Sequence, residues 1–209
     1  TLTEQRKDLG RPRKIDRAIW QSLAELGWLG LSVPESQGGS GMTTVVAASL
    51  CEVLGRHLFS TPYIAAGLMP AAVLVAANSG GASSLLEKFV IGDQLMCLAW
   101  QESPDQIDPA EPDAVVNAHH LSGRKVFVTA LEEDSIVLVS ALIDSEIAII
   151  AVPADANGIS ITRYATAQSS YSDIVFDDVE LSEAQILLKG AEALNLSLIH
   201  ISEPTRLSV

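Results

Sequence analysis

The hydrophobic periodicity of the chain changes near Gly92, and this change limits the fold more than any other sequence feature. Apolar residues before it recur at helical spacing, which predicts helices over residues 15–26, 43–58, 63–77 and 83–90. Short runs rich in β-branched residues follow it, which predicts strands over residues 95–100, 124–129, 136–141, 147–152, 159–162 and 174–179. Helices followed by strands are typical of an α+β protein.

This order predicts two domains. We expect an all-α N-terminal domain over residues 1–92 and an antiparallel β-barrel or sandwich domain over residues 93–182. In the helix predicted at 43–58, the spacing places Val46, Leu50, Val53 and Leu54 on the inward face. The glycine-rich segment 38–41 fits neither a dinucleotide-binding nor a P-loop pattern and predicts a tight turn or a flexible loop.

The composition excludes several classes of function. The net charge is −13, and the residues after position 17 carry 7 basic against 23 acidic side chains, which argues against a nucleic-acid partner. The densest apolar segment, residues 63–77, is shorter than the roughly 20 residues needed to cross a bilayer and contains Pro70, so a buried helix is expected and not a membrane span. The histidines lack partners at zinc spacing, so no metal site is expected.

Two cysteines and four polar or aromatic residues bear on location and binding. Cys51 and Cys97 lie in apolar runs, as expected of reduced thiols in a cytoplasmic protein. A second group lies on or just past two predicted strands and combines ring surface with short polar groups, as a flat heteroaromatic ligand requires. Its members are Trp100, Gln101, Phe127 and Thr129. The alternative is that both aromatic residues are ordinary core and both polar residues ordinary surface.

Four sequence blocks, taken in order, carry a family resemblance. Residues 20–42 read W-x-x-L-A-E-L-G-W-L-G-L-S-V-P-E-x-x-G-G-S-G-M, and residues 121–130 read L-S-G-R-K-V-F-V-T-A. Residues 152–160 read V-P-A-D-A-x-G-I-S, and residues 175–179 read V-F-D-D-V. In order and spacing these blocks resemble the acyl-CoA dehydrogenases, over about residues 15–194.

The resemblance implies a chemistry. Members of this family hold FAD between the middle β-domain and a C-terminal four-helix domain, oxidise acyl-CoA thioesters to 2-enoyl-CoA, and pass electrons to electron-transfer flavoprotein. The matching positions imply cofactor binding by Leu98, Trp100, Gln101, Phe127, Val128 and Thr129. No catalytic residue is assigned here, because the family's catalytic Glu lies in the C-terminal domain. The resemblance also implies an oligomer, homomeric or heteromeric.

The chain departs from the family pattern in its flavin-binding segments. The usual T-E-P-x-A-G-S-D becomes Q-E-S-P-D-Q-I-D at residues 101–108, so the Gly-Ser pair that approaches the flavin pyrophosphate is absent. Ala130 and Leu131 follow Thr129 where Asn-Gly or Asn-Ala is usual. The A-W-Q-E segment at 99–102 resembles a divergent branch of small subunits from heteromeric dicarboxylyl- or steroid-CoA dehydrogenases. Some such subunits are non-catalytic partners, which is the alternative function.

The ends of the chain carry a separate expectation. A complete family member is longer, so we expect a truncated fragment without the C-terminal four-helix domain, with residues 183–195 as the start of the linker or of that domain. Residues 196–209 resemble the translation of a ligated adapter and are expected to be a non-native tail. Without the family, the same residues would be interpreted as an unrelated helical domain joined to a ligand-binding β-sandwich.

Overall fold

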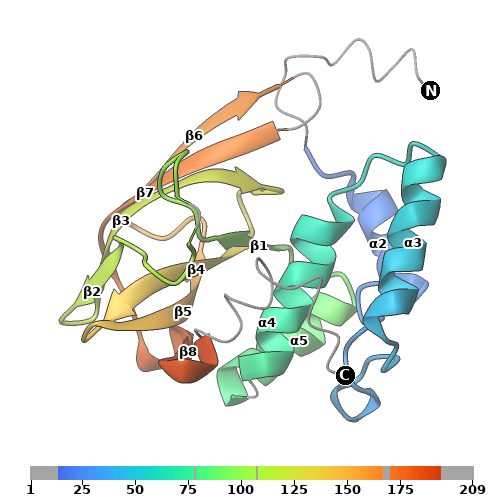
Figure 1. The fold of residues 1–209 in the computed structure, drawn as a ribbon, viewed down its shortest axis with the longest axis horizontal. Helices are drawn as coiled ribbons and strands as arrows, with labels where there is room; N and C mark the ends of the chain where they lie inside the picture. The colour runs from blue at the N-terminus through green and yellow to red at the C-terminus, as the bar shows by residue number, and fades with distance from the viewer. Residues whose placement is uncertain (1–13, 78, 107, 167–169, 194–209) are drawn as a thin grey trace.

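Helices and strands occupy opposite sides of the molecule in the computed structural model, which describes residues 14–77, 79–106, 108–166 and 170–193 (Figure 1). The helices are α2 (Arg17–Glu25), α3 (Thr44–Arg56), α4 (Met69–Ala77) and α5 (Gly80–Val90). Three shorter helical segments are η1 (Glu35–Gln37), η2 (Tyr63–Leu68) and η3 (Glu183–Gln185). α4 lies next to β1 (Met96–Ala99), and α3 lies farther from the sheet.

Helix starts follow from capping side chains. Asp16 accepts hydrogen bonds from the backbone N–H groups of Ala18 and Ile19 at the start of α2. Ser79 accepts one from the N–H of Ala82, so α5 begins at Gly80, three residues before the predicted start. The helix predicted over 63–77 is divided, with a π-helical first part and α4 as the second.

The predicted inward face of α3 is wrong in part. Val46 and Val53 are 41% and 51% exposed, whereas Leu50 and Leu54 pack against the core as partly buried residues. Only Ala47 of this helix is fully buried. The helix is apolar around most of its circumference, so spacing alone does not identify the face that packs.

A single eight-stranded sheet forms the second half of the described chain. The strands after β1 are β2 (Val115–Asn117), β3 (His120–Thr129), β4 (Ile136–Ile143), β5 (Glu146–Pro153), β6 (Ile159–Ala165), β7 (Ser170–Glu180) and β8 (Ile186–Lys189). Their order is β6-β7-β3-β2-β4-β5-β8, and β1 pairs with β4. This confirms the α+β class, with the helices first and the strands second.

Three features of the sheet differ from the prediction. β1 and β2 pair with β4 in parallel, so the sheet is mostly but not wholly antiparallel. Among the described strands the two ends of the sheet, β6 and β8, are not paired with each other, so the sheet is open where a closed barrel was one expectation. β2 and β8 were not predicted, because β2 has only three residues and β8 is a short apolar run without alternation. β8 lies within residues 183–195, where a linker was expected; the expected tail at 196–209 lies outside the described residues.

Alternating residues of the central strands supply two hydrophobic cores. Leu138 of β4 packs in the core shared with the helices, and its neighbours Val137 and Val139 pack in the core within the sheet. Successive strand residues point to opposite faces, so a single strand serves both cores. β4 is therefore covered on both sides, and the helices are fixed against one face of the sheet.

The glycine-rich segment 38–41 is a tight turn. A Cβ atom on Gly39 would lie 2.2 Å from the carbonyl oxygen of Val33, so only glycine fits at this position. The N–H of Ser40 donates to the carbonyl of Gly30 at 3.0 Å, and the N–H of Gly41 donates to the carbonyl of Val33 at 2.8 Å. These bonds close the turn on the preceding segment, and nothing in its geometry requires a phosphate.

Within the described ranges, no helix combines the length and apolar character that a membrane span requires. The same ranges contain no group of three His, Cys, Asp or Glu residues placed to hold a metal ion.

Candidate functional site

A β-bulge in β3 turns one aromatic ring away from the core. Lys125 pairs with Ile174 of β7 and Val128 pairs with Ser172, so two residues of β3 lie opposite one residue of β7. The second of them, Phe127, has a φ of +55°, a conformation that costs an L-residue roughly 1–2 kcal/mol. Its side chain is 38% exposed, while those of both neighbours are buried. The backbone is therefore strained where it presents this ring.

Two tyrosines extend the exposed ring into an outer aromatic strip, formed by Phe127, Tyr171 and Tyr164. The rings of Phe127 and Tyr171 meet edge to face at 6.2 Å, and the rings of Tyr171 and Tyr164 stack at 6.0 Å. The hydroxyl of Tyr164 donates to Asp173 at 3.0 Å, and the guanidinium of Arg124 donates to the same carboxylate at 2.6 Å. The strip thus lies beside a paired carboxylate on the outer face of β3, β7 and β6.

The charges around this carboxylate affect two pKa values. Burial raises the pKa of Asp173, but hydrogen bonds from Arg124, Tyr164 and the backbone of Phe127 outweigh it and lower that pKa below its usual value. Burial and the bond to Asp173 raise the pKa of the Tyr164 hydroxyl. The carboxylate is therefore held in its charged form and the hydroxyl in its neutral form.

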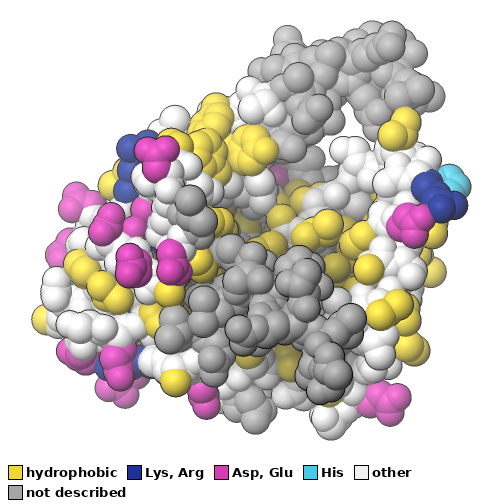
Figure 2. All heavy atoms as spheres, in the orientation of Figure 1, with side chains coloured by type: hydrophobic (Ala, Val, Ile, Leu, Met, Phe, Trp, Pro, Cys, Tyr) yellow, Lys and Arg dark blue, Asp and Glu magenta, His cyan; other side chains and the backbone are white. Residues whose placement is uncertain are grey.

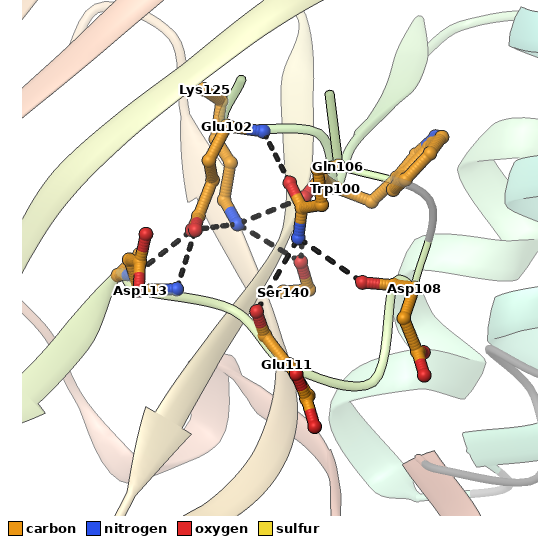
Figure 3. A network of polar contacts seen from close by, with 9 residues as sticks. Trp100, Glu102, Gln106, Asp108, Glu111, Asp113, Lys125 and Ser140 are labelled. Atoms are coloured by element: carbon orange, nitrogen blue, oxygen red, sulfur yellow. Dashed lines mark hydrogen bonds and ion pairs between the residues drawn. The ribbon is translucent and has the colours of Figure 1, made fainter. Parts of the chain in front are cut away.

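The inner face of β3 carries a buried lysine. The ammonium of Lys125 donates to Glu102 Oε1 at 2.6 Å, to Ser140 Oγ at 3.0 Å and to the carbonyl oxygen of Trp100 at 3.2 Å (Figure 3). Its side chain is fully buried, and that of Glu102 is 8% exposed. The three donors of the ammonium therefore each have an acceptor, two in the loop directly after β1 and one on β4.

Glu102 also closes the loop between β1 and β2. Its Oε1 accepts from the N–H of Ala114 at 2.9 Å, and its Oε2 accepts from the N–H of Asp113. Gln106 accepts from the N–H of Glu102 at 2.6 Å and donates to the carbonyl of Glu111 at 3.4 Å (Figure 3). The loop is therefore fixed from within, with Lys125 beneath it.

Burial lowers the pKa of Lys125 to about 8, because desolvation disfavours the ammonium; Glu102 and Asp113 oppose this effect and favour the charged form. Two other buried groups have the opposite shift. Burial raises the pKa of Cys97 to about 12 and that of Tyr63 also to about 12. These two groups lie in the cores and remain neutral.

The predicted site residues lie in three environments. Leu98 and Val128 pack in the two cores, so Val128, 2% exposed, can offer a ligand only its backbone. Trp100 and Gln101 are partly buried at the end of β1. The carbonyl of Gln101 accepts from the N–H of Val126 at 2.7 Å, which joins this segment to the bulge. Phe127 is not core, contrary to the alternative above.

Thr129, two residues after Phe127 on β3, lines a groove of about 370 Å³. α2, η2 with the residues just before it, and the end of β3 line this groove, with Ile19, Ile64, Ala65 and Thr129 among its walls. Figure 2 shows apolar side chains gathered around a hollow between the sheet and the helices. Phe127 and Thr129 therefore connect the outer strip with the groove, two residues apart on one strand.

Sequence reasoning missed two parts of this arrangement. Tyr164 and Tyr171 belong to the outer strip, and their pairing in register across β6 and β7 was not evident from spacing. Glu102 and Lys125 form the buried pair. The buried pair could have been predicted from the lysine between apolar residues of a predicted strand, since a buried charge needs a partner.

The outer strip suits the ring of a flavin. An exposed aromatic ring on rigid backbone, with hydroxyl and backbone groups nearby, offers the contacts that a flat heteroaromatic ring needs. The residues that could hold FAD are Phe127 by its ring, Thr129 by its hydroxyl and Gln101 by its amide, whose nitrogen donates to the carbonyl of Ser103 at 3.1 Å. The Gly-Ser pair of the family segment has no counterpart in this sequence, so these residues fit the ring portion of the cofactor.

Known proteins resemble this chain in both sequence and structure. Residues 2–90 match the family model described as "Acyl-CoA dehydrogenase, N-terminal domain". Acyl-CoA dehydrogenase FadE27 of Mycobacterium tuberculosis is 26% identical over 170 residues, which are 78% of this chain and 44% of FadE27. The chain thus spans less than half the length of that relative.

Two solved structures agree with these matches. The ChsE4-ChsE5 complex from Mycobacterium tuberculosis has a TM-score of 0.76 and 25% identity, over 94% of this chain and 54% of the matched chain. A G363A variant of the Tcur3481-Tcur3483 steroid acyl-CoA dehydrogenase has a TM-score of 0.74 and 28% identity, over 88% and 50%.

These matches exclude the alternative of an unrelated helical domain joined to a β-sandwich, because the same proteins match both halves of the chain. The helices correspond to the N-terminal domain of those proteins and the sheet to their middle β-domain. The chain is therefore similar to acyl-CoA dehydrogenases, in sequence most clearly over residues 2–90 and in fold over both halves.

Proposed function

We propose that this protein is an FAD-dependent acyl-CoA dehydrogenase subunit that oxidises an acyl-CoA thioester to 2-enoyl-CoA and passes two electrons to electron-transfer flavoprotein. The observation that supports it most is the exposed ring of Phe127, held at a strained bulge in a chain that is similar to acyl-CoA dehydrogenases. FAD, when bound, supplies the acceptor for the hydride that leaves the substrate's β-carbon. We assign no base for the α-proton to any described residue.

The side chains of the outer strip and of the groove would have different parts in holding the flavin and the acyl group. Phe127 provides a flat surface that excludes water from one side of the ring, and Tyr171 fixes its orientation by an edge-to-face contact. Thr129 offers a hydroxyl at the point where the outer strip meets the groove. The apolar walls of the groove, among them Ile19 and Ile64, suit the hydrocarbon part of an acyl group.

The substrate class is a narrower proposal. One matched structure is a steroid acyl-CoA dehydrogenase, and the A-W-Q-E segment resembles the branch that contains such enzymes. A bulky polycyclic acyl group is therefore the first class to test, with dicarboxylyl and straight-chain acyl-CoA as comparisons.

The test uses the protein encoded by the complete gene. After FAD is supplied, acyl-CoA thioesters of the three classes are added without oxygen, and flavin absorbance is followed. We expect bleaching with one class and re-oxidation by electron-transfer flavoprotein. A colourless protein that takes up no FAD, or a flavoprotein that none of the thioesters bleaches, would contradict the proposal.

A second candidate is a non-catalytic partner subunit, which the match to the two-protein ChsE4-ChsE5 complex favours. Such a subunit would contribute an interface without turnover. Co-expression with a second acyl-CoA dehydrogenase subunit separates the two functions. A partner role predicts that turnover needs both proteins and survives Phe127→Ala in this one, whereas the catalytic role predicts that this substitution abolishes it.

A further inference from the structure

Lys125 occupies a position that connects the buried interior to the outer strip. Its ammonium donates to the carbonyl of Trp100, the carboxylate of Glu102 and the hydroxyl of Ser140, so it joins the loop directly after β1 to β4. An apolar residue of similar volume could fill the same space without the cost of burying charge. The buried pair of Lys125 and Glu102 is therefore better explained by the segments that it holds in place than by a gain in stability.

Two bonds fix β1 against β3 beside the bulge. Lys125 binds the carbonyl of Trp100, and the next residue, Val126, donates its N–H to the next carbonyl, that of Gln101, at 2.7 Å. The register shift of β3 begins directly after Lys125, and Phe127 follows with its φ of +55°. Phe127 thus comes directly after two residues, Lys125 and Val126, that are both bonded to the segment following β1.

We infer that Lys125 is a positioning residue that holds the end of β1 against the bulge and thereby keeps the Phe127 ring presented to the isoalloxazine of FAD. This role rests on the proposed FAD binding. It does not make Lys125 a catalytic residue, because its side chain is fully buried on the opposite face of β3.

The test compares wild type with K125M and with the double variant K125M/E102Q. The single variant leaves Glu102 charged without its partner and is expected to fold poorly. The double variant removes both charges, and the amide introduced by E102Q can still accept a bond from the loop backbone, so we expect it to fold. K189M is the matched control, since it removes an exposed lysine at the end of β8, the far edge of the sheet, that pairs with Asp144 in the turn between β4 and β5.

Two readouts distinguish positioning from a merely structural role. Amide hydrogen exchange needs no cofactor: in the double variant we expect exchange of Val126 and Phe127 to be about tenfold faster, with the β4–β5 ladder unchanged. In the FAD-loaded protein from the complete gene we expect a Kd for FAD at least about tenfold weaker and a shifted flavin absorption spectrum, while K189M matches wild type.

Failure of the positioning role and failure of the proposed FAD binding give different results. A double variant with wild-type exchange at the bulge, FAD affinity and spectrum would overturn the positioning role, and so would a uniform rise in exchange across the whole sheet. A wild-type protein that takes up no FAD would instead overturn the proposed function, and the positioning of a flavin-facing ring with it.

Discussion

The two faces of β3 differ in what their side chains do. On the inner face, Lys125 is fully buried and each donor of its ammonium has an acceptor. On the outer face, Arg124 is 61% exposed in its pair with Asp173, and Phe127 is 38% exposed. One strand therefore carries a buried ion pair in which each charge needs its partner and, on the other side, exposed groups that the fold could lose.

This contrast indicates where function can be separated from stability. A buried charge that loses its partner destabilises the fold strongly, whereas an exposed pair contributes little because water and salt screen it. Removing one partner of the inner pair should therefore reduce the free energy of unfolding strongly, whereas substitutions on the outer face should affect ligand binding with little loss of stability.

The largest effect is expected for K125M. Removing the ammonium leaves the carboxylate of Glu102 buried without its partner, which should lower the free energy of unfolding by about 3–5 kcal/mol. Urea denaturation of K125M, with K189M as the control on an exposed pair, measures it. A loss of less than about 1 kcal/mol would show that the two faces do not differ as described.

The pH dependence of stability tests the same contrast. The pKa of Lys125 is about 8 in the fold and near 10.5 when unfolded, so between these values the unfolded state binds more protons. The cost of the buried charge is complete below pH 8 and disappears as the pH rises to about 10.5. Relative to K125M/E102Q, wild type should therefore gain of the order of 3 kcal/mol across this window.

Urea midpoints of both proteins at several pH values from 7.5 to 10.5 would measure this gain. The raised pKa values of Cys97 and Tyr63 cost stability at high pH, but both proteins contain these groups, so their effect cancels in the difference. A difference that is flat or falls with pH would show that Lys125 is not desolvated.

A smaller change in stability is expected on the outer face, with a large change in binding. F127A should lose FAD binding while its free energy of unfolding falls by about 1–2 kcal/mol at most, because the ring is partly exposed. F127G should be more stable than F127A by about 1 kcal/mol, since glycine adopts a φ of +55° without strain. FAD titration and urea denaturation check both variants; an F127A protein that binds FAD as wild type does would remove Phe127 from the site.

The smallest effect is expected for R124M. Its pair with Asp173 is exposed on the arginine side, so the free energy of unfolding should fall by less than about 1 kcal/mol, and less still in high salt. Denaturation at low and high salt measures it. A loss as large as that of K125M would mean that the outer face, too, is part of what holds the fold.

Hydrophobic periodicity was enough to predict the order of helices and strands along the chain, but not which strands pair. The helical and strand halves and six of the strands could be predicted, because their side chains repeat with the period of each structure. The parallel pairing of β1 and β2 with β4 depends on contacts between distant residues, which no local pattern contains. The exposed side of α3 was missed for the same reason, since Val46 and Val53 are as apolar as the leucines that pack.

The candidate site was predictable only in part. Phe127 and Gln101 were singled out by residue type and family resemblance, and the structure brings their segments together through Val126. The bulge that exposes the phenylalanine, and the tyrosines beside it, depend on a register shift between β3 and β7. A register shift is a property of two strands, so the sequence of one strand could not reveal it.

The decisive measurement is a crystal structure of the protein from the complete gene with FAD bound. We predict that the isoalloxazine ring lies against the outer face of β3 in contact with Phe127, with Lys125 still bonded to Trp100 and Glu102 beneath it. A flavin bound elsewhere, with Phe127 left exposed to solvent, would contradict both the proposed site and the role of the bulge.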